Sequence, residues 1–187
     1  MLDNKLYDLF ETEAKYLPNI NSLQYDDTDN NAQYVLMTER QFYNGLFTGE
    51  CNIIAYIILF DDKFKGDRVL LTSGYKTIKS YLGLARRDLR MYPKDKKKQL
   101  HAIRSLYVAG KLIKESIPTI EDMIHLHDKY SKMDIDIKGL GAYQKYLREL
   151  LTNKLNRGDI TLYPNFSESN EIVDKINYMN NIKNFKY

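Results

Sequence analysis

The chain has 187 residues, of which 43% are hydrophobic and 28% are charged, and its formal net charge is +3. This length can bury one sizeable core, so we expect a single compact domain over residues 1–187. The lone cysteine, Cys51, excludes an intramolecular disulfide, and the longest apolar run, Ile53–Phe60, is far shorter than the ~20 residues of a membrane-spanning helix. Because the N-terminal residues are acidic where a secretory signal needs a basic flank, we expect a soluble, cytoplasmic protein.

Apolar residues at three- and four-residue spacing predict a mainly α fold of about seven helices. In chain order, the pattern predicts helices over residues 2–16, 38–47, 75–90, 96–113, 119–132, 143–156 and 170–182. The first helix ends before Pro18, Gly49 lies just past the second, and Thr119 begins the fifth as a cap with Asp122. Segments rich in Asn, Asp and Ser predict a polar loop over residues 18–36 and another over residues 157–169.

The apolar run Ile53–Phe60 has two interpretations. Its β-branched residues favour a strand, and a minor strand pair within residues 53–71 would then form. A buried helix produces the same unbroken apolarity, and we favour this interpretation. In either case the run is expected to pack in the core, with Cys51 beside it as a core residue rather than a nucleophile.

Positive charge is concentrated in one part of the chain. Between Arg86 and Lys114 there are ten Lys and Arg but only two acids, Asp88 and Asp95, which gives a local charge of +8 and leaves −5 for the remainder. Such a concentration attracts phosphates and other anions, although a lysine-rich face that is merely solvated has the same composition.

The helix predicted over residues 96–113 carries part of this charge on one edge. Lys97, His101 and Arg104 are spaced by four and three residues, so they share a face, and Lys111 follows two turns later. The apolar residues of the same segment form a separate stripe that suits burial. The basic edge is therefore a candidate anion-binding surface.

Two further groups of residues resemble metal sites but are better explained otherwise. Asp134 and Asp136 would point the same way on a strand and could hold a divalent metal, yet a short acidic hinge between helices explains them more simply. His125 and His127 are two residues apart, so on a helix they diverge and cannot share a metal. We predict no metal site, no cofactor and no catalytic residue.

Two neighbouring segments resemble a known family. The segments are SGYKTIKSYLGLARRDLR and KKKQLHAIRSLYVAGKLI. The residues that carry the resemblance are Ser80, Tyr81, Gly83 and Ala85, then Lys97 or Lys98, then His101, Arg104 and Leu106. This pattern resembles the helical second half of predicted nucleotidyltransferases of the DNA polymerase β superfamily, found in bacteria and their phages, and the resemblance extends over residues 26–179. It implies that the basic helix edge faces nucleotide phosphates.

The chain departs from that family in lacking the Gly-Ser turn and paired carboxylates that hold Mg²⁺ in the family's N-terminal half. We therefore expect a nucleotidyltransferase-like, phage-derived protein that binds nucleotide or RNA phosphate but does not transfer nucleotides in isolation, with Mg²⁺ as a cofactor only if transfer occurs. The alternative is a non-enzymatic protein that binds and inhibits a host enzyme or defence factor, for which abundant Tyr suits an interface. The predicted phosphate ligands are Lys79, Arg86, Lys97, Lys98, His101, Arg104 and Lys111.

Overall fold

The computed structural model describes residues 23–27, 32–36, 42, 45, 49–59 and 74–162. The chain divides into two compact units, residues 1–44 and residues 45–187, and each is described by itself. The expectation of one domain over residues 1–187 stays a prediction.

The first unit contains an antiparallel strand pair, β1 (Leu23–Asp27) and β2 (Ala32–Leu36). Its register pairs Leu23 with Leu36 and Asp27 with Ala32. These strands lie inside the segment 18–36 that was expected to be a polar loop. The Asp- and Asn-rich residues between the strands have turn-forming composition, while Tyr and Val in the strands have high β propensity, and composition averaged over the whole segment hides this alternation.

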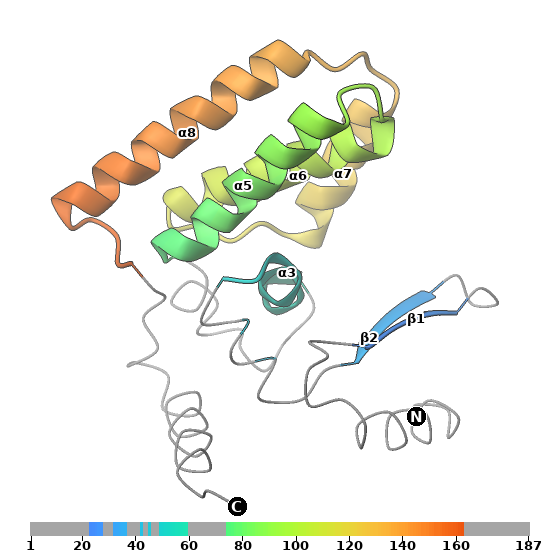
Figure 1. The fold of residues 1–187 in the computed structure, drawn as a ribbon, viewed down its shortest axis with the longest axis horizontal. Helices are drawn as coiled ribbons and strands as arrows, with labels where there is room; N and C mark the ends of the chain where they lie inside the picture. The colour runs from blue at the N-terminus through green and yellow to red at the C-terminus, as the bar shows by residue number, and fades with distance from the viewer. Residues whose placement is uncertain are drawn as a thin grey trace, which may run out of the picture. The chain divides into compact units, whose positions relative to one another are not determined.

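The second unit is mainly α (Figure 1). Its described helices are α3 (Cys51–Leu59), α5 (Tyr75–Met91), α6 (Lys96–Ile113), α7 (Ile120–Ser131) and α8 (Ile137–Arg157). The described part of the chain thus has five helices rather than about seven. The helices predicted over residues 2–16 and 170–182 lie outside the described residues, and of the one predicted over 38–47 only Phe42 and Gly45 are described, both helical.

The apolar run after Cys51 forms helix α3, so the interpretation as a helix is confirmed for residues 53–59. Ile53 and Ile54 are buried, which agrees with the expected place of this run in the core. The Tyr81 hydroxyl of α5 donates to the Cys51 carbonyl at 3.0 Å. A strand pair starting at Ile53 is therefore wrong, and residues 60–71 lie outside the described part.

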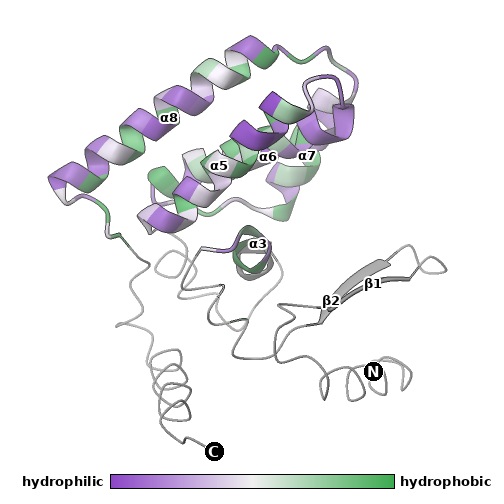
Figure 2. Ribbon diagram, viewed as in Figure 1, coloured by the Kyte–Doolittle hydropathy of each residue, from purple (hydrophilic) through white to green (hydrophobic). Residues whose placement is uncertain are grey.

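Helices α5 and α6 form the centre of the second unit. They run back along each other after the short turn at residues 92–95, and the Asp95 side chain caps α6 by accepting from the Lys98 amide. The fully buried side chains of these two helices include Ile78, Leu82, Leu106 and Leu112. Each helix also carries hydrophilic residues along its length (Figure 2), as expected of helices with one buried face.

Helix α8 packs along α5 and begins earlier than expected. It starts at Ile137, not Tyr143, because the Asp136 carboxylate accepts from the Gly139 amide at 2.9 Å and caps the first turn. Gly139 and Gly141 indicated a loop in the sequence, but the cap and the packing beyond it outweigh their low helix propensity. Gln144 and Leu147 are buried, and the Gln144 amide donates to the Leu82 carbonyl of α5 at 3.2 Å.

Helix α7 is the least buried helix of those described. Thr119 and Asp122 form the predicted capping box at its start, with hydrogen bonds of 3.0 and 3.1 Å in the two directions. None of its residues is buried. Within the described residues, no helix combines the length and apolar character that a membrane crossing requires.

Candidate phosphate-binding face of helices α5 and α6

The exposed face of α5 is basic along most of its length. Lys79, Gly83, Arg86 and Arg90 are spaced by four, three and four residues, and all four are exposed. We call these four residues the α5 stripe. The only acid of α5, Asp88, is buried on another side of the helix, so no carboxylate of this helix interrupts the stripe.

Two arginines of the α5 stripe are available to a ligand. Within the described residues, neither Arg86 nor Arg90 takes part in an ion pair or a side-chain hydrogen bond. Lys79 lies with its ammonium 5.6 Å from the centre of the Tyr75 ring. At 1.5 Å per residue, the stripe from Lys79 to Arg90 extends about 16 Å, a length over which a nucleic-acid strand presents several phosphates.

The middle of the α5 stripe is open. A Cβ atom added at Gly83 would meet no other atom within 4 Å. A ligand can therefore approach the helix backbone between Lys79 and Arg86 without a side chain in its way. A Cβ atom therefore fits at this exposed position without a clash, which makes position 83 suitable for a test variant.

Asp88 forms a buried charge cluster with Arg87 and His101. Its side chain is 0% exposed, and it accepts two hydrogen bonds from Arg87, at 2.8 and 2.9 Å. Its second oxygen lies 2.5 Å from His101 Nδ1 on α6. Burial raises the pKa of Asp88, but the hydrogen bonds from His101 and Arg87 outweigh it and hold this pKa below its ordinary value.

This cluster changes the expected role of His101. Because Nδ1 of His101 lies against Asp88, only Nε2 is left for an outside ligand, and the side chain is 38% exposed. The Asp88 carboxylate also offsets positive charge at this position. His101 thus ties α6 to α5, and its direct contact with phosphate stays a prediction.

The remaining predicted residues of α6 have different surroundings. Lys97 is exposed and has no side-chain partner among the described residues, whereas the Lys98 ammonium lies 5.5 Å from the centre of the Tyr92 ring. Arg104 is half-buried, and its Nε is fully buried without a hydrogen-bond partner in the described part of the chain. Lys111 lies 3.7 Å from Asp122 of α7, and Tyr107 together with Asp122 raises the pKa of this lysine.

The cations of the predicted basic edge of α6 therefore differ in whether they are free to bind a ligand. Lys97 at one end is free, His101 is bound to Asp88, and Lys111 at the other end is paired with Asp122. The sequence analysis missed Arg90 and the open position at Gly83. The spacing of Lys79, Gly83, Arg86 and Arg90 on one exposed helix face was the signal that could have found the α5 stripe.

The other candidate residues of the sequence, the metal ligands and the cysteine nucleophile, form no site among the described residues. Among the described residues, no three or more His, Cys, Asp or Glu side chains come together as a metal site would require. Asp136 caps α8, as a hinge carboxylate should. Burial and the nearby Glu50 raise the pKa of the Cys51 thiol to about 12, so almost none of it is the nucleophilic thiolate at neutral pH.

Comparisons with known proteins leave the site to be interpreted from its own geometry. No protein-family model, no curated protein and no solved structure matches the chain.

Proposed function

We propose that the chain binds the phosphate groups of RNA through the α5 stripe and Lys97 of α6, and that it acts by binding rather than by nucleotidyl transfer. The observation that carries this proposal is the row of exposed cations on α5, two of which have no partner among the described residues. Unpaired arginines favour phosphate because their fork of donors matches its oxygens.

The charge of the surrounding helices supports the proposal. Residues 74–162 contain nineteen Lys and Arg against ten Asp and Glu, a net charge of +9, although the whole chain carries only +3. A positive field of this kind draws a polyanion towards the helices and strengthens every individual phosphate contact. It is the electrostatic pattern typical of nucleic-acid-binding domains.

An RNA strand fits the α5 stripe better than a single nucleotide does. The cations are spread along about 16 Å of helix rather than gathered around one point, and no Gly-rich loop is available to enclose a triphosphate. Each phosphate would therefore meet one or two cations, and several phosphates are needed for useful affinity. We expect a mononucleotide to bind far more weakly than an RNA of ten or more nucleotides.

The test inserts one charge into the stripe without disturbing the fold. Gly83→Glu places a carboxylate in open space between Lys79 and Arg86, and Gly83→Gln is its neutral counterpart of the same shape. Both variants improve helix propensity, so neither should unfold α5. Binding to a fluorescent RNA pool and to labelled ATP is measured by anisotropy over a salt series from about 20 to 300 mM.

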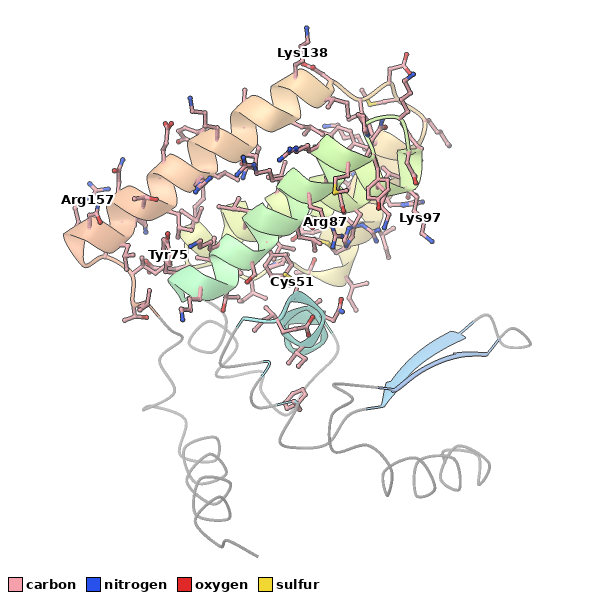
Figure 3. All side chains as sticks on the ribbon, in the orientation of Figure 1. Cys51, Tyr75, Arg87, Lys97, Lys138 and Arg157 are labelled. Carbon is pink, nitrogen blue, oxygen red and sulfur yellow. The ribbon has the colours of Figure 1, made fainter. Side chains whose placement is uncertain are left out.

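We expect wild type and Gly83→Gln to bind RNA equally, with affinity falling steeply with salt, and Gly83→Glu to bind roughly five- to tenfold more weakly at low salt. Lys138→Glu, on an exposed residue at the start of α8 (Figure 3), is the control for a change of net charge on another helix. Equal affinities of the Glu and Gln variants at position 83, or no RNA binding at low salt, would contradict the proposal.

A protein-binding, inhibitory role is the second candidate, and exposed apolar residues favour it. Ile120 and Ile124 on α7 are 40% and 56% exposed, and Tyr143 and Tyr146 stack on the surface of α8 with ring centres 6.2 Å apart. Aromatic and aliphatic side chains of this kind form the centres of protein interfaces. A nuclease-resistant complex with one host protein, lost in Ile124→Asp but kept in Gly83→Glu, would favour this candidate over RNA binding.

A further inference from the structure

A pocket lies where helices α6, α7 and α8 meet, apart from the α5 stripe. Its volume is about 240 Å³, and its walls combine apolar, aromatic and cationic side chains. The lining residues are Ile103, Leu106, Tyr107, Gly110, Lys111 and Lys114 of α6 and its C-cap, Leu126 and Tyr130 of α7, and Leu140 and Tyr143 of α8.

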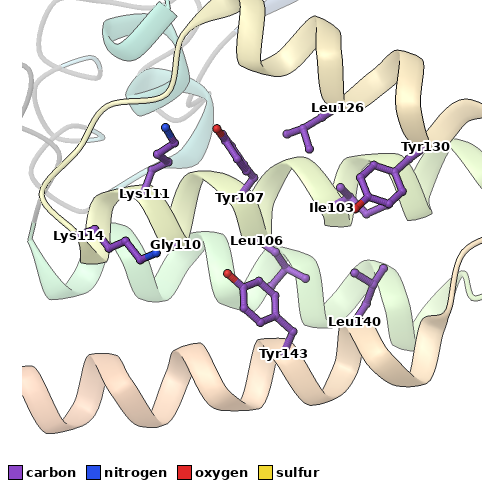
Figure 4. A pocket seen from close by; sticks show the side chains of 10 residues that line it. All are labelled: Ile103, Leu106, Tyr107, Gly110, Lys111, Lys114, Leu126, Tyr130, Leu140 and Tyr143. Atoms are coloured by element: carbon purple, nitrogen blue, oxygen red, sulfur yellow. The ribbon is translucent and has the colours of Figure 1, made fainter.

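The pocket has an apolar end and a cationic end (Figure 4). Ile103, Leu126, Tyr130 and Leu140 gather at one end. Lys111 and Lys114 lie at the other, together with the hydroxyl groups of Tyr107 and Tyr143. A ligand that matches both ends needs an apolar body and an anionic group joined closely to it.

The two lysines are not equivalent. Lys111 is engaged with Asp122, and its ammonium lies 5.4 Å from the centre of the Tyr107 ring. Lys114 is exposed and has no side-chain partner among the described residues. Lys114 therefore supplies the uncompensated positive charge of the pocket, and the Tyr143 hydroxyl adds a donor on the same side.

Gly110 keeps the middle of the pocket open. A Cβ atom at this position would lie 3.2 Å from the Tyr143 hydroxyl oxygen, so even a methyl group would enter the space between α6 and α8. Gly110 lies inside α6, where a glycine costs about 1 kcal/mol of helix stability relative to alanine. The space that a side chain at position 110 would fill is therefore part of the pocket volume.

We propose that this pocket binds a small aromatic carboxylate, with its ring among Leu126, Tyr130 and Leu140 and its carboxylate at Lys114 and the Tyr143 hydroxyl. An aromatic body suits the three tyrosine rings of the wall, which offer edge and face contacts to a second ring. The volume is below the range of pockets for drug-sized molecules, which limits the ligand to one or two fused rings. The site does not depend on the proposed RNA binding.

The test uses the full chain with 2-naphthoate and its neutral amide, 2-naphthamide, as probes in equilibrium dialysis. We expect 2-naphthoate to bind in a saturable way and 2-naphthamide to bind several-fold more weakly, because the amide lacks the charge that Lys114 recognises. Lys114→Gln should weaken 2-naphthoate by about three- to fivefold, the effect of one partly exposed charge pair, and should leave 2-naphthamide unchanged. Lys138→Gln, at an exposed position of α8 outside the pocket, is the matched control.

A second variant tests the volume of the pocket rather than its charge. Gly110→Leu should abolish binding of both probes, and helix content by circular dichroism checks that the variant is folded. As an independent reading, saturating 2-naphthoate should slow hydrogen exchange of the α7 amides in the wild type, because the ligand would add contacts to a helix that has no buried residue. Equal binding of acid and amide, binding that survives in Gly110→Leu, or no saturable binding would overturn the proposal.

Discussion

At the scale of single residues, Asp88 is the one charged residue that is buried among those the structure describes. Its side chain is completely buried and accepts hydrogen bonds from Arg87 of the same helix. It also lies against His101 of α6, and this second contact joins α5 to α6. Removing the carboxylate would leave the half-exposed Arg87 and His101 without their buried partner. Removing one member of a buried ion pair costs more than removing one member of an exposed pair, because it leaves the remaining charged groups unpaired.

We therefore predict that Asp88→Asn lowers the free energy of unfolding by about 1–3 kcal/mol, the lower part of the range for buried charged groups because Arg87 and His101 are partly exposed. Urea denaturation at pH 7 measures the loss. Asp95→Asn, at an exposed N-cap where asparagine serves as well as aspartate, is the control and should change stability little. If Asp88→Asn and Asp95→Asn were equally stable, the Asp88 cluster would not be what holds α5 against α6.

The same cluster predicts a dependence on pH. Because the pKa of Asp88 is lower in the folded chain than in the unfolded chain, its contribution is complete above the unfolded value of about 3.9 and is lost as the pH falls through the folded value. The difference in stability between wild type and Asp88→Asn should thus be present at pH 5 and shrink as the pH falls below 4. A difference that stays constant or grows between pH 4 and pH 2 would contradict this assignment.

At the scale of the elements, most helix positions could be predicted from the sequence. The stripe of Leu100, Ile103 and Leu106 and the cap at Thr119 place α6 and α7 almost as observed, because helix periodicity and capping are local properties. The start of α8 could not be predicted in the same way. Gly139 and Gly141 in its first turns have low helix propensity. The packing of Gln144 and Leu147 on α5 outweighs this, and it is a tertiary interaction that local sequence does not reveal.

The candidate site shows the same division between local and tertiary information. The concentration of Lys and Arg on α5 and α6 is visible in the sequence, and so is the spacing that puts Arg86 and Arg90 on one face. The pairing of His101 with Asp88 joins residues thirteen apart on two helices, so helix periodicity alone does not reveal it. Spacing within one helix predicts which side chains share a face but not which of them are already engaged by a neighbour.

Helix α7 is predicted to be the first described helix to open. It has no buried residue, whereas α6 is buried along most of its length, and helices are held mainly by the packing of an apolar face. We expect the amides of α7 to exchange with solvent faster than those of α6 in hydrogen-exchange mass spectrometry. Thr119→Ala removes the acceptor of the capping box and should speed exchange in α7 further, at a local cost of about 1 kcal/mol, without changing α6.

One control variant and one wild-type outcome test this prediction. Thr152→Ala removes a hydroxyl from an exposed position of α8 and should leave α7 exchange unchanged. Protection of α7 equal to that of α6 in the wild type would mean that α7 is held by contacts beyond those of the described residues. The proposal of a pocket between α6, α7 and α8 predicts, in addition, that 2-naphthoate restores part of the protection lost in Thr119→Ala.

At the scale of the whole molecule, the uneven charge distribution affects stability as well as binding. Residues 74–162 carry a net charge of +9, and the repulsion among these cations opposes the close packing of the helices that bear them. Salt and phosphate both weaken this repulsion, although they act differently. Salt screens all charges, whereas a bound polyanion supplies negative charge where the cations are densest.

We predict that raising NaCl from about 20 to 200 mM increases the melting temperature of the chain by a few degrees, since the Debye length then falls from about 20 Å to below 10 Å. A short RNA at low salt should raise the melting temperature at least as much, and the gain should disappear at the higher salt, where RNA binding is weak. The RNA effect should be smaller in Gly83→Glu than in Gly83→Gln, although both variants respond to NaCl as the wild type does. If RNA stabilises the Glu and Gln variants equally, the polyanion acts through net charge alone, and the α5 stripe is not its site.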